Sequence, residues 1–450
     1  MPFAARFRSR LGALLLASFV IAALASTATA TSAKASRLQS RVINGSPVTA
    51  PTYAARWSYV VALVSAKSTD ARDGQFCAGS LITPTLVLTA AHCVTTDDSE
   101  FSAEGDEDFH IHKSLVKGHR LALTINAPAA VDVIAGRRTL SDDASGERIH
   151  VTGIIVHPKY DQYTARFDVA LLRLASAPAG ATSVQIAGPT ESALWGNGAG
   201  MAVNVPTSSP AIVGWGERAS GQISVFGVTL ANTLSEVAVP IRSDDECDHG
   251  GPAAGLGYGR NFDPTTQLCV GTLDTSNYLN DSSATPNGTG ACYGDSGGPL
   301  MVTDGAGGWR VAGITSWGIE CGSRTFFSVY TRAAAIQAFA TSNPPLPVRN
   351  VKAPRVTGRK LVGKTVGCNR GVWTGEGTIR YTYQWFTVRH LNDPTPTVVS
   401  PISRAVTPRL RLKTAQAGAL VHCAVTATNP SWTQTVNSSN VGPVGELRLR

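Results

Sequence analysis

The sequence predicts an all-β protein, and three observations lead to that prediction. The 450 residues include 44 glycines and 25 prolines, the residue types that most often form turns. The apolar residues occur in short runs at close spacing, and turn residues separate these runs, as in a β-barrel or β-sandwich. Hydrophobic residues make up 43% of the chain, which is enough for a large core, and the length favours two or three domains.

Most of the expected strands lie in the first part of the chain. A second set is expected between Ala211 and Thr331, followed by one terminal helix over Ala333 to Thr341. The acidic stretch from Asp97 to Asp108 has few apolar residues and is predicted to be an exposed loop. The strands predicted before residue 180 are Tyr59 to Val64, Ser80 to Ile82, Leu86 to Thr89, Val131 to Ala135, Ile149 to Val156 and Val169 to Leu174.

Residues 1–30 are predicted to be a secretory signal peptide. A basic start precedes an almost wholly apolar run from Leu11 to Leu24, and Ala28-Thr29-Ala30 fits the small-x-small cleavage pattern. An N-terminal anchor helix is the alternative. No later run is long and apolar enough for a membrane span, so the mature protein is expected to be soluble, secreted and extracellular. The eight cysteines, an even number in an exported chain, are then expected to form disulfides.

The C-terminal part is predicted to be a separate module. The prolines of Asn343 to Pro347 favour extended geometry, so residues 344–353 are expected to be a stiff linker. In residues 354–450, Cys368, Trp385 and Cys423 follow the cysteine, tryptophan, cysteine order of an immunoglobulin-like β-sandwich.

The charge is divided unevenly between the two parts. Residues 42–348 carry 18 basic and 28 acidic residues, a net charge of −10, whereas residues 349–450 carry 15 basic and 3 acidic residues, a net charge of +12. The basic module is expected to favour an acidic polymer or a negatively charged cell surface rather than nucleic acid. A solvated basic face, or docking against the acidic part of the chain, is the alternative.

Three segments carry residue types suited to nucleophilic catalysis. They are Leu88 to Cys93, which contains His92, Phe167 to Leu172, which contains Asp168, and Gly294 to Pro299, which contains Ser296. A serine hydroxyl needs a base within hydrogen-bonding reach, and the base needs an orienting carboxylate. Asp161 is a rival for the carboxylate role, but it lacks an apolar strand after it, so we favour Asp168.

These motifs, in this order, resemble the trypsin/chymotrypsin family of serine proteases over about residues 42–340. The resemblance implies two six-stranded antiparallel β-barrels of the chymotrypsin type and a serine endopeptidase domain over residues 42–343. It also implies that Ser296 attacks the peptide carbonyl, His92 is the general base and Asp168 orients it. The backbone N–H groups of Gly294 and Ser296 would form the oxyanion hole. Protein or peptide substrates and a monomeric state are expected.

The resemblance also implies how the cysteines pair. The expected disulfides in the protease part are Cys77–Cys93, Cys247–Cys269 and Cys292–Cys321. The remaining pair, Cys368–Cys423, falls inside the C-terminal module. This module resembles the immunoglobulin-like repeats appended to many secreted bacterial enzymes.

Arg41 precedes Val42-Ile43-Asn44-Gly45, which resembles the activation site of the family. The resemblance implies that residues 31–41 are a propeptide and that cleavage after Arg41 frees the amine of Val42. That ammonium would pair with Asp295, which is costly to bury alone. A start set by signal cleavage alone is the alternative.

The base of the primary specificity pocket is expected at Gly290, where a trypsin-type enzyme would carry an aspartate. We therefore expect cleavage after uncharged residues, small aliphatic ones first, and a separate trypsin-like activator, because a buried cation without a partner is disfavoured. The other residues expected to contact substrate are Tyr293, Ser316, Trp317, Gly318 and Ser328.

No cofactor and no metal are predicted. The histidines of His110-Ile111-His112 suit a solvated loop better than a metal site, and the stretch from Arg137 to Glu147 begins with two arginines where a calcium loop needs oxygen ligands. A non-catalytic scaffold that acts by binding is the rival to an enzyme, but none of the required catalytic residues is missing.

Overall fold

The computed structural model describes most of the chain. The described residues are 42–97, 123–180, 182–190, 210–216, 231–249, 257–273, 288–304, 306–319, 321–323, 325–390 and 397–446. The chain divides into the units Met1–Leu38 and Gln39–Arg450, and all described residues belong to the second. The predicted signal peptide, the propeptide with Arg41, residues 98–108 of the acidic stretch and His110 to His112 lie outside the described residues.

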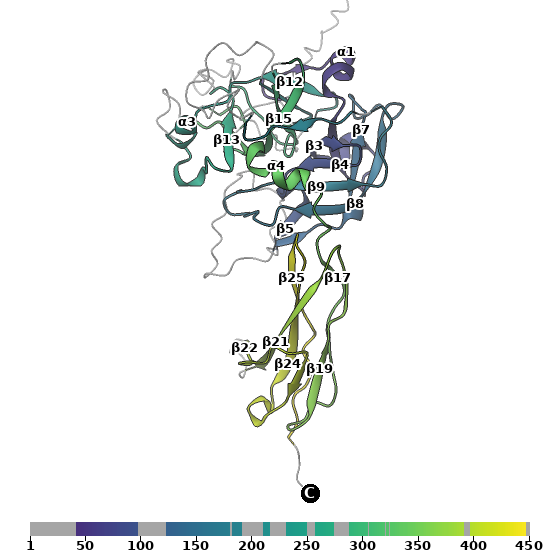
Figure 1. The fold of residues 1–450 in the computed structure, drawn as a ribbon, viewed down its shortest axis with the longest axis vertical. Coiled ribbons are helices and arrows are strands. Elements are labelled where there is room, and N and C mark those ends of the chain that lie inside the picture. Colours follow the sequence, from purple (N-terminus) through teal and green to yellow (C-terminus); the bar gives the residue numbers. More distant parts are fainter. Residues whose placement is uncertain are drawn as a thin grey trace, which may run out of the picture. The chain divides into compact units, whose positions relative to one another are not determined.

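The first part forms a closed six-stranded barrel in the order β2-β3-β4-β9-β8-β7 (Figure 1). Its strands are made largely of buried residues, and this apolar interior accounts for their short, Val- and Leu-rich runs. Each strand predicted before residue 180 overlaps one of them. The bounds are β2 Val60–Ser65, β3 Gln75–Thr83, β4 Leu86–Thr89, β7 Val131–Ala135, β8 Glu147–Val156 and β9 Ala170–Leu174.

A second, eight-stranded sheet follows the order β1-β12-β11-β14-β15-β16-β13, with β10 pairing in parallel with β15. The described strands of this sheet do not make the closed six-stranded barrel that we expected, which stays a prediction. A single bridge, Ile241 to Val270, links the segment after β12 to β13. The bounds are β1 Ser46–Pro47, β10 Gln185–Ile186, β11 Ala211–Gly214, β12 Ser235–Ala238, β13 Gln267–Val270, β14 Pro299–Thr303, β15 Trp309–Trp317 and β16 Ser328–Arg332.

The described helices are short, apart from the terminal one. Helix α4 covers Ala333–Thr341, as the sequence predicted, and buries Ala333, Ile336 and Ala340. The others are α1 Ala50–Thr52, η1 Tyr53–Trp57, α2 Ala71–Gly74, η2 His92–Val94, η3 Pro128–Ala130, α3 Asp244–His249, η5 Gly259–Asn261 and η6 Thr414–Gln416, and a small ribbon pairs β5 Thr95–Asp97 with β6 Leu123–Ile125. Among the described residues, no helix is both long and apolar enough to cross a membrane.

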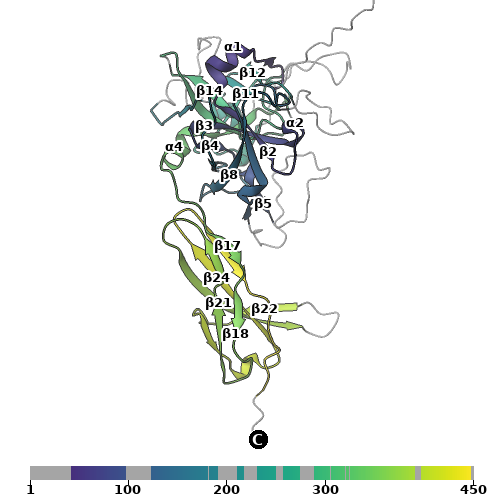
Figure 2. The same cartoon turned by 90° about the vertical axis from the view of Figure 1, so that its right-hand side faces the viewer.

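The C-terminal strands form two main sheets, β18-β19-β23 and β22-β21-β24-β25, and a small ribbon β17-β20 (Figure 2). Residues from both main sheets share one apolar cluster, in which Trp385 is fully buried beside Cys368 and Cys423. Strand β17 lies inside the predicted linker. The bounds are β17 Arg349–Lys352, β18 Arg355–Thr357, β19 Thr365–Asn369, β20 Val372–Thr374, β21 Arg380–His390, β22 Thr397–Pro401, β23 Arg409–Arg411, β24 Leu420–Thr428 and β25 Thr433–Asn437.

All eight cysteines are paired, and the four disulfides are the predicted ones. They are Cys77–Cys93, Cys247–Cys269, Cys292–Cys321 and Cys368–Cys423.

Candidate active site

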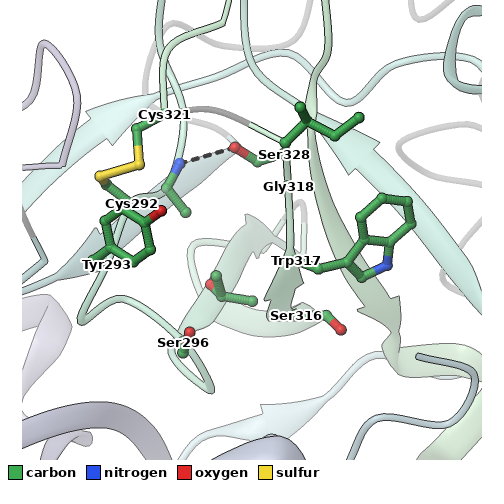
Figure 3. Close-up of a pocket in the computed structure, with 11 residues that line it drawn as sticks. Cys292, Tyr293, Ser296, Ser316, Trp317, Gly318, Cys321 and Ser328 are labelled. Atoms are coloured by element: carbon green, nitrogen blue, oxygen red, sulfur yellow. Dashed lines mark hydrogen bonds between the residues drawn. A yellow bond between two sulfur atoms is a disulfide. The ribbon is translucent and has the colours of Figure 1, made fainter. Parts of the chain in front are cut away.

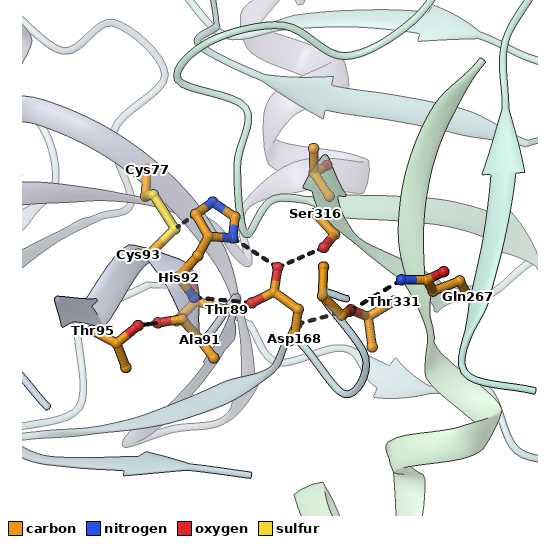
Figure 4. A network of polar contacts seen from close by, with 12 residues as sticks. Cys77, Thr89, Ala91, His92, Cys93, Thr95, Asp168, Gln267, Ser316 and Thr331 are labelled. Carbon is orange, nitrogen blue, oxygen red and sulfur yellow. Dashed lines mark hydrogen bonds and ion pairs between the residues drawn. A yellow bond between two sulfur atoms is a disulfide. The ribbon is translucent and has the colours of Figure 1, made fainter. Parts of the chain in front are cut away.

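Two neighbouring barrel strands bring a histidine and an aspartate together (Figure 4). His92 begins the short helix after β4, and Asp168 lies just before β9, which pairs antiparallel with β4. The imidazole Nδ1 lies 2.7 Å from Asp168 Oδ2, and the backbone N–H of His92 donates to Asp168 Oδ1 at 2.9 Å. The carboxylate therefore fixes the histidine through both its ring and its backbone.

The Asp168 carboxylate is buried, but several protein groups donate hydrogen bonds to it. Its residue is 1% exposed, and the Ser316 hydroxyl donates to Oδ2 at 2.5 Å. Burial raises the pKa of Asp168, but the opposing interaction with His92 and the hydrogen bonds from His92 and Ser316 outweigh burial, so its net pKa is lowered. An ionised Asp168 accepts from Nδ1–H and leaves Nε2 of His92 as the basic nitrogen.

Two glycines shape the turn that carries Ser296. Gly294 has φ 88° and Gly297 has φ 76°, a region that favours glycine. The carbonyl of Ser296 accepts from the backbone N–H of Ala78 on β3 at 2.8 Å, while the N–H of Gly297 donates to the carbonyl of Thr315 on β15 at 2.8 Å. The turn is thus bonded both to the first barrel and to the second sheet.

A small pocket of about 60 Å³ opens beside Ser296 (Figure 3). The Cys292–Cys321 disulfide joins two of its walls, and Trp317 forms another side. The lining residues are Ala291, Cys292, Tyr293, Ser296, Thr315, Ser316, Trp317, Gly318, Ile319, Cys321 and Ser328. All the residues predicted to contact substrate, except Gly290, line this pocket.

Gly290 does not line the pocket, because Ser328 lies in front of it. A Cβ at Gly290 would lie 2.6 Å from Ser328 Oγ, and this hydroxyl accepts from the backbone N–H of Ala291 at 3.1 Å. By contrast, the nearest atom to a Cβ at Gly318 would be 3.9 Å away. The pocket therefore carries a serine at its inner end and no side chain at Gly318.

Asp295, beside the nucleophile candidate, is a buried acid without a cationic partner among its described contacts. It is 1% exposed, and its two oxygens accept from the backbone N–H groups of Gly216 and Cys292 at 2.8 and 3.0 Å. Burial raises its pKa to about 7, and these two hydrogen bonds only partly oppose the rise. A Cβ at Gly214 or Gly216 would collide with the carboxylate, so this site requires glycine at both positions.

The residues after Arg41 are buried next to Gly290 and Ala291, which shortly precede Asp295 in the chain. Val42 is fully buried in the same apolar cluster as Ala291, and the N–H of Ile43 donates to the carbonyl of Gly290 at 3.2 Å. Val42 has φ 67°, a left-handed conformation that is costly for a β-branched residue.

Several contacts that support the site were not predicted from the sequence. The Thr331 hydroxyl donates to the carbonyl of Asp168 at 2.9 Å, and Ser316 bonds Asp168 although the sequence predicted only a substrate contact for it. No local motif marks these contacts, because they join residues far apart in the chain. The rival carboxylate, Asp161, instead accepts from the N–H of Tyr163 in its own loop at 3.0 Å.

Potential metal ligands in the described part of the chain do not make a convincing centre. Cys77, His92 and Cys93 lie close together, but both sulfurs belong to a disulfide and cannot be thiolate ligands. In the loop after β7, the Arg137 guanidinium donates to the carbonyls of Leu140 and Ser145 and to the Asp143 carboxylate. A side-chain cation thus occupies the loop that we compared with a calcium site.

Comparison with known proteins places these features in a protein family. The sequence profile of the trypsin family matches residues 46–340. The chain is 29% identical over 264 residues to trypsin from Saccharopolyspora erythraea, covering 58% of this chain and 85% of that protein. It is 27% identical over 261 residues to trypsin-1 from Astacus astacus, covering 58% and 84%. The match to mouse ovochymase-2, 28% over 287 residues, covers 63% of this chain but 36% of that longer protein.

Proposed function

The chain belongs to the trypsin family of serine proteases, and from that premise we propose that it is a secreted serine endopeptidase acting through Ser296, His92 and Asp168. The observation that carries the proposal is the bonded pair of His92 and Asp168, with Ser296 in the lining of a pocket that also contains Ser316, which donates to Asp168.

The proposed chemistry follows from the tautomer that Asp168 imposes. Nε2 of His92 takes the proton of the Ser296 hydroxyl as Oγ attacks the peptide carbonyl. The imidazolium then gives this proton to the leaving amine, and an acyl-enzyme forms. Water attacks the ester by the same route in reverse and releases the acid. Throughout, the buried Asp168 stabilises the charged imidazolium.

The tetrahedral intermediates carry an oxyanion, and we propose that the backbone N–H groups of Gly294 and Ser296 bind it. The positive φ of Gly294 orients this stretch of backbone. Donors fixed in advance need no reorganisation as charge develops, and losing one such donor typically costs about 3–4 kcal/mol.

Activation by cleavage after Arg41 has two supports in the structure. The carboxyl of Asp295 is buried with a pKa raised to about 7, so it is costly to ionise alone, and an ammonium beside it would supply the missing counter-charge. Val42 is already buried, in a strained backbone conformation, in the apolar cluster that contains Ala291, four residues before Asp295. Cleavage would remove the preceding peptide unit, so the conformational strain at Val42 would be relieved as the new amine forms.

The pocket favours a small uncharged side chain on the substrate. Its volume is about 60 Å³, Ser328 occupies its inner end, and none of the described residues that line it is acidic. A lysine or arginine side chain would there lose water without gaining a counterion. A separate trypsin-like protease would then be needed to cleave after Arg41.

For the C-terminal region we propose an immunoglobulin-like accessory domain over residues 354–450. Its support is the buried Trp385 packed between two sheets that the Cys368–Cys423 disulfide links. The family profile ends at residue 340, before this region.

The proposed activity is tested by covalent labelling with a fluorophosphonate, which reacts with an activated serine. The chain should become labelled after trypsin cleaves at Arg41, and the Ser296→Ala variant should not. The Arg41→Gln variant should remain unlabelled after the same treatment. A cleaved chain that folds but is never labelled would favour the rival, a non-catalytic protease-like scaffold.

A further inference from the structure

The outward face of the sheet β18-β19-β23 is built from polar and basic residues. Alternate residues of these strands point inward, and four of them, Val356, Val366, Cys368 and Leu410, belong to the buried cluster. The outward residues between them are exposed, except for the partly exposed Gly367 at the centre. Together they form what we call the arginine face: Arg355, Thr357, Thr365, Gly367, Asn369, Arg409 and Arg411.

The strand register fixes how the three arginines are spread. Gly367 pairs with Thr357 on one side and with Arg409 on the other, and Arg411 pairs with Thr365. Arg409 and Arg411 are two residues apart on one strand, about 7 Å. Arg355 is on the other edge strand, about 10 Å across the sheet, and the register also offsets it along the strands, so it lies about 12 Å from Arg409 and about 17 Å from Arg411. The guanidinium groups are therefore anchored at separate points of an open surface.

The charge on the arginine face is not neutralised within the described part of the chain. None of Arg355, Arg409 and Arg411 takes part in an ion pair or a side-chain hydrogen bond there, and no outward position of the three strands is acidic. The other main sheet differs, since its strand β21 presents Arg380, Thr382, Gln384 and Phe386 on the side facing away from Trp385. Strand β21 also carries Arg389, so the strands of the two main sheets hold three arginines on the arginine face and two on β21.

We propose that the arginine face binds a linear acidic polysaccharide. The guanidinium fork suits carboxylate groups in two-point contact, and three forks anchored about 7–17 Å apart suit a polymer with repeated charges better than a single small anion. Threonine and asparagine side chains between the arginines offer hydrogen bonds to sugar hydroxyls.

Nucleic acid is the other polyanion to consider, and the composition of the face argues against it. Single strands gain much of their affinity from bases stacked on aromatic side chains. No outward residue of β18, β19 or β23 is aromatic. This inference goes beyond the proposed peptidase activity and does not depend on it, since binding needs only the C-terminal strands.

The test uses the full-length chain with Ser296→Ala, so that proteolysis does not interfere. Binding to immobilised polygalacturonate is measured at about 0.01 M and about 0.15 M ionic strength, where the Debye lengths are about 30 and 8 Å. Neutral dextran, single-stranded oligothymidylate and free citrate are tested in parallel. The arginine-face variant carries Arg355→Gln, Arg409→Gln and Arg411→Gln. The matched control removes three charges elsewhere, by Arg349→Gln, Lys352→Gln and Arg380→Gln.

We expect polygalacturonate binding that weakens with salt, and a loss of about tenfold or more in the arginine-face variant against about threefold or less in the control. Thermal unfolding of both variants should match the parent, because the changed side chains point outward. A triple Arg→Lys variant at the same positions, which keeps the charge but not the fork, should bind with intermediate affinity.

Three results would overturn the proposal. They are no binding to polygalacturonate even at low salt, equal losses in the arginine-face and control variants, or tighter binding of oligothymidylate than of polygalacturonate. Competition by citrate at the concentration of polymer carboxylates would likewise show that a small anion, and not a polymer, fits the site.

Discussion

At the scale of single residues, the site depends on two buried aspartates with opposite behaviour. Both Asp168 and Asp295 are 1% exposed. Asp168 faces His92 and Ser316, so its pKa is lowered, whereas Asp295 receives two backbone N–H groups and its pKa is raised to about 7. The difference comes from the partners, since burial acts in the same direction on both.

Replacing the orienting acid should abolish most of the activity. In Asp168→Asn the side-chain amide favours the wrong tautomer of His92, so kcat for a peptide substrate should fall by about 10⁴-fold with little change in KM. The matched control is Asp161→Asn, which changes the rival carboxylate in its own loop and should leave kcat within about twofold. Similar losses in the two variants would contradict the assignment of Asp168.

The raised pKa of Asp295 predicts how the stability of the uncleaved precursor changes with pH. The folded state holds the proton up to about pH 7, while the unfolded state releases it near 3.8. The folded state thus binds more protons between these values, and its free energy of unfolding should fall by roughly 4 kcal/mol as the pH rises from about 4 to 7.

This pH effect can be measured as the difference between denaturant titrations of Arg41→Gln and of Arg41→Gln with Asp295→Asn. The second variant lacks the titrating group, so the difference isolates Asp295 from other carboxylates, including Asp168, whose lowered pKa acts in the opposite direction. Parallel pH profiles of the two variants would refute the prediction.

At the scale of elements, the side chains of the site lie at strand ends and in the short connections between strands. The pairing of β4 with β9 brings His92 to Asp168, and the first residue of β16, Ser328, reaches the inner end of the pocket. The specificity pocket is thus set where β15 and β16 run side by side, with Trp317 opposite Val329.

Shortening Ser328 should enlarge the pocket. In Ser328→Gly the hydroxyl beside Gly290 is removed, so kcat/KM for substrates with leucine or phenylalanine at the cleaved position should rise about tenfold relative to alanine. A cleavage profile on a peptide library measures the change, with Ser342→Gly, an exposed serine outside the pocket, as the control. An unchanged profile, or a parent profile dominated by arginine or lysine, would show that the pocket is wrongly assigned.

At the scale of the whole chain, the catalytic contacts and the C-terminal core involve different residues. The core around Trp385 contains residues of strands β18 to β24 and none of the active-site residues. This separation predicts that the C-terminal part can lose stability without loss of proteolysis.

Trp385→Ala should destabilise the C-terminal part by about 3–5 kcal/mol, because it removes a fully buried aromatic side chain. Calorimetry should show one transition moving to lower temperature, while kcat/KM on a short peptide stays within about twofold. The control is Val399→Ala, at a position that is 53% exposed. It should change neither the transition temperature nor kcat/KM. Loss of peptidase activity together with the transition would contradict this prediction.

The sequence by itself determined the all-β class, the strands of the first barrel and helix α4, while the family resemblance of its motifs supplied the four cysteine pairings and the three candidate catalytic residues. Apolar alternation, turn residues and extended motifs are local signals, so they can be read along the chain. Only the tertiary structure decided that Ser316 and Thr331 bond Asp168, that Ser328 and not Gly290 ends the pocket, and that Asp295 sits between Gly216 and Cys292. These contacts depend on strand register and on atoms distant in sequence, which no local pattern encodes.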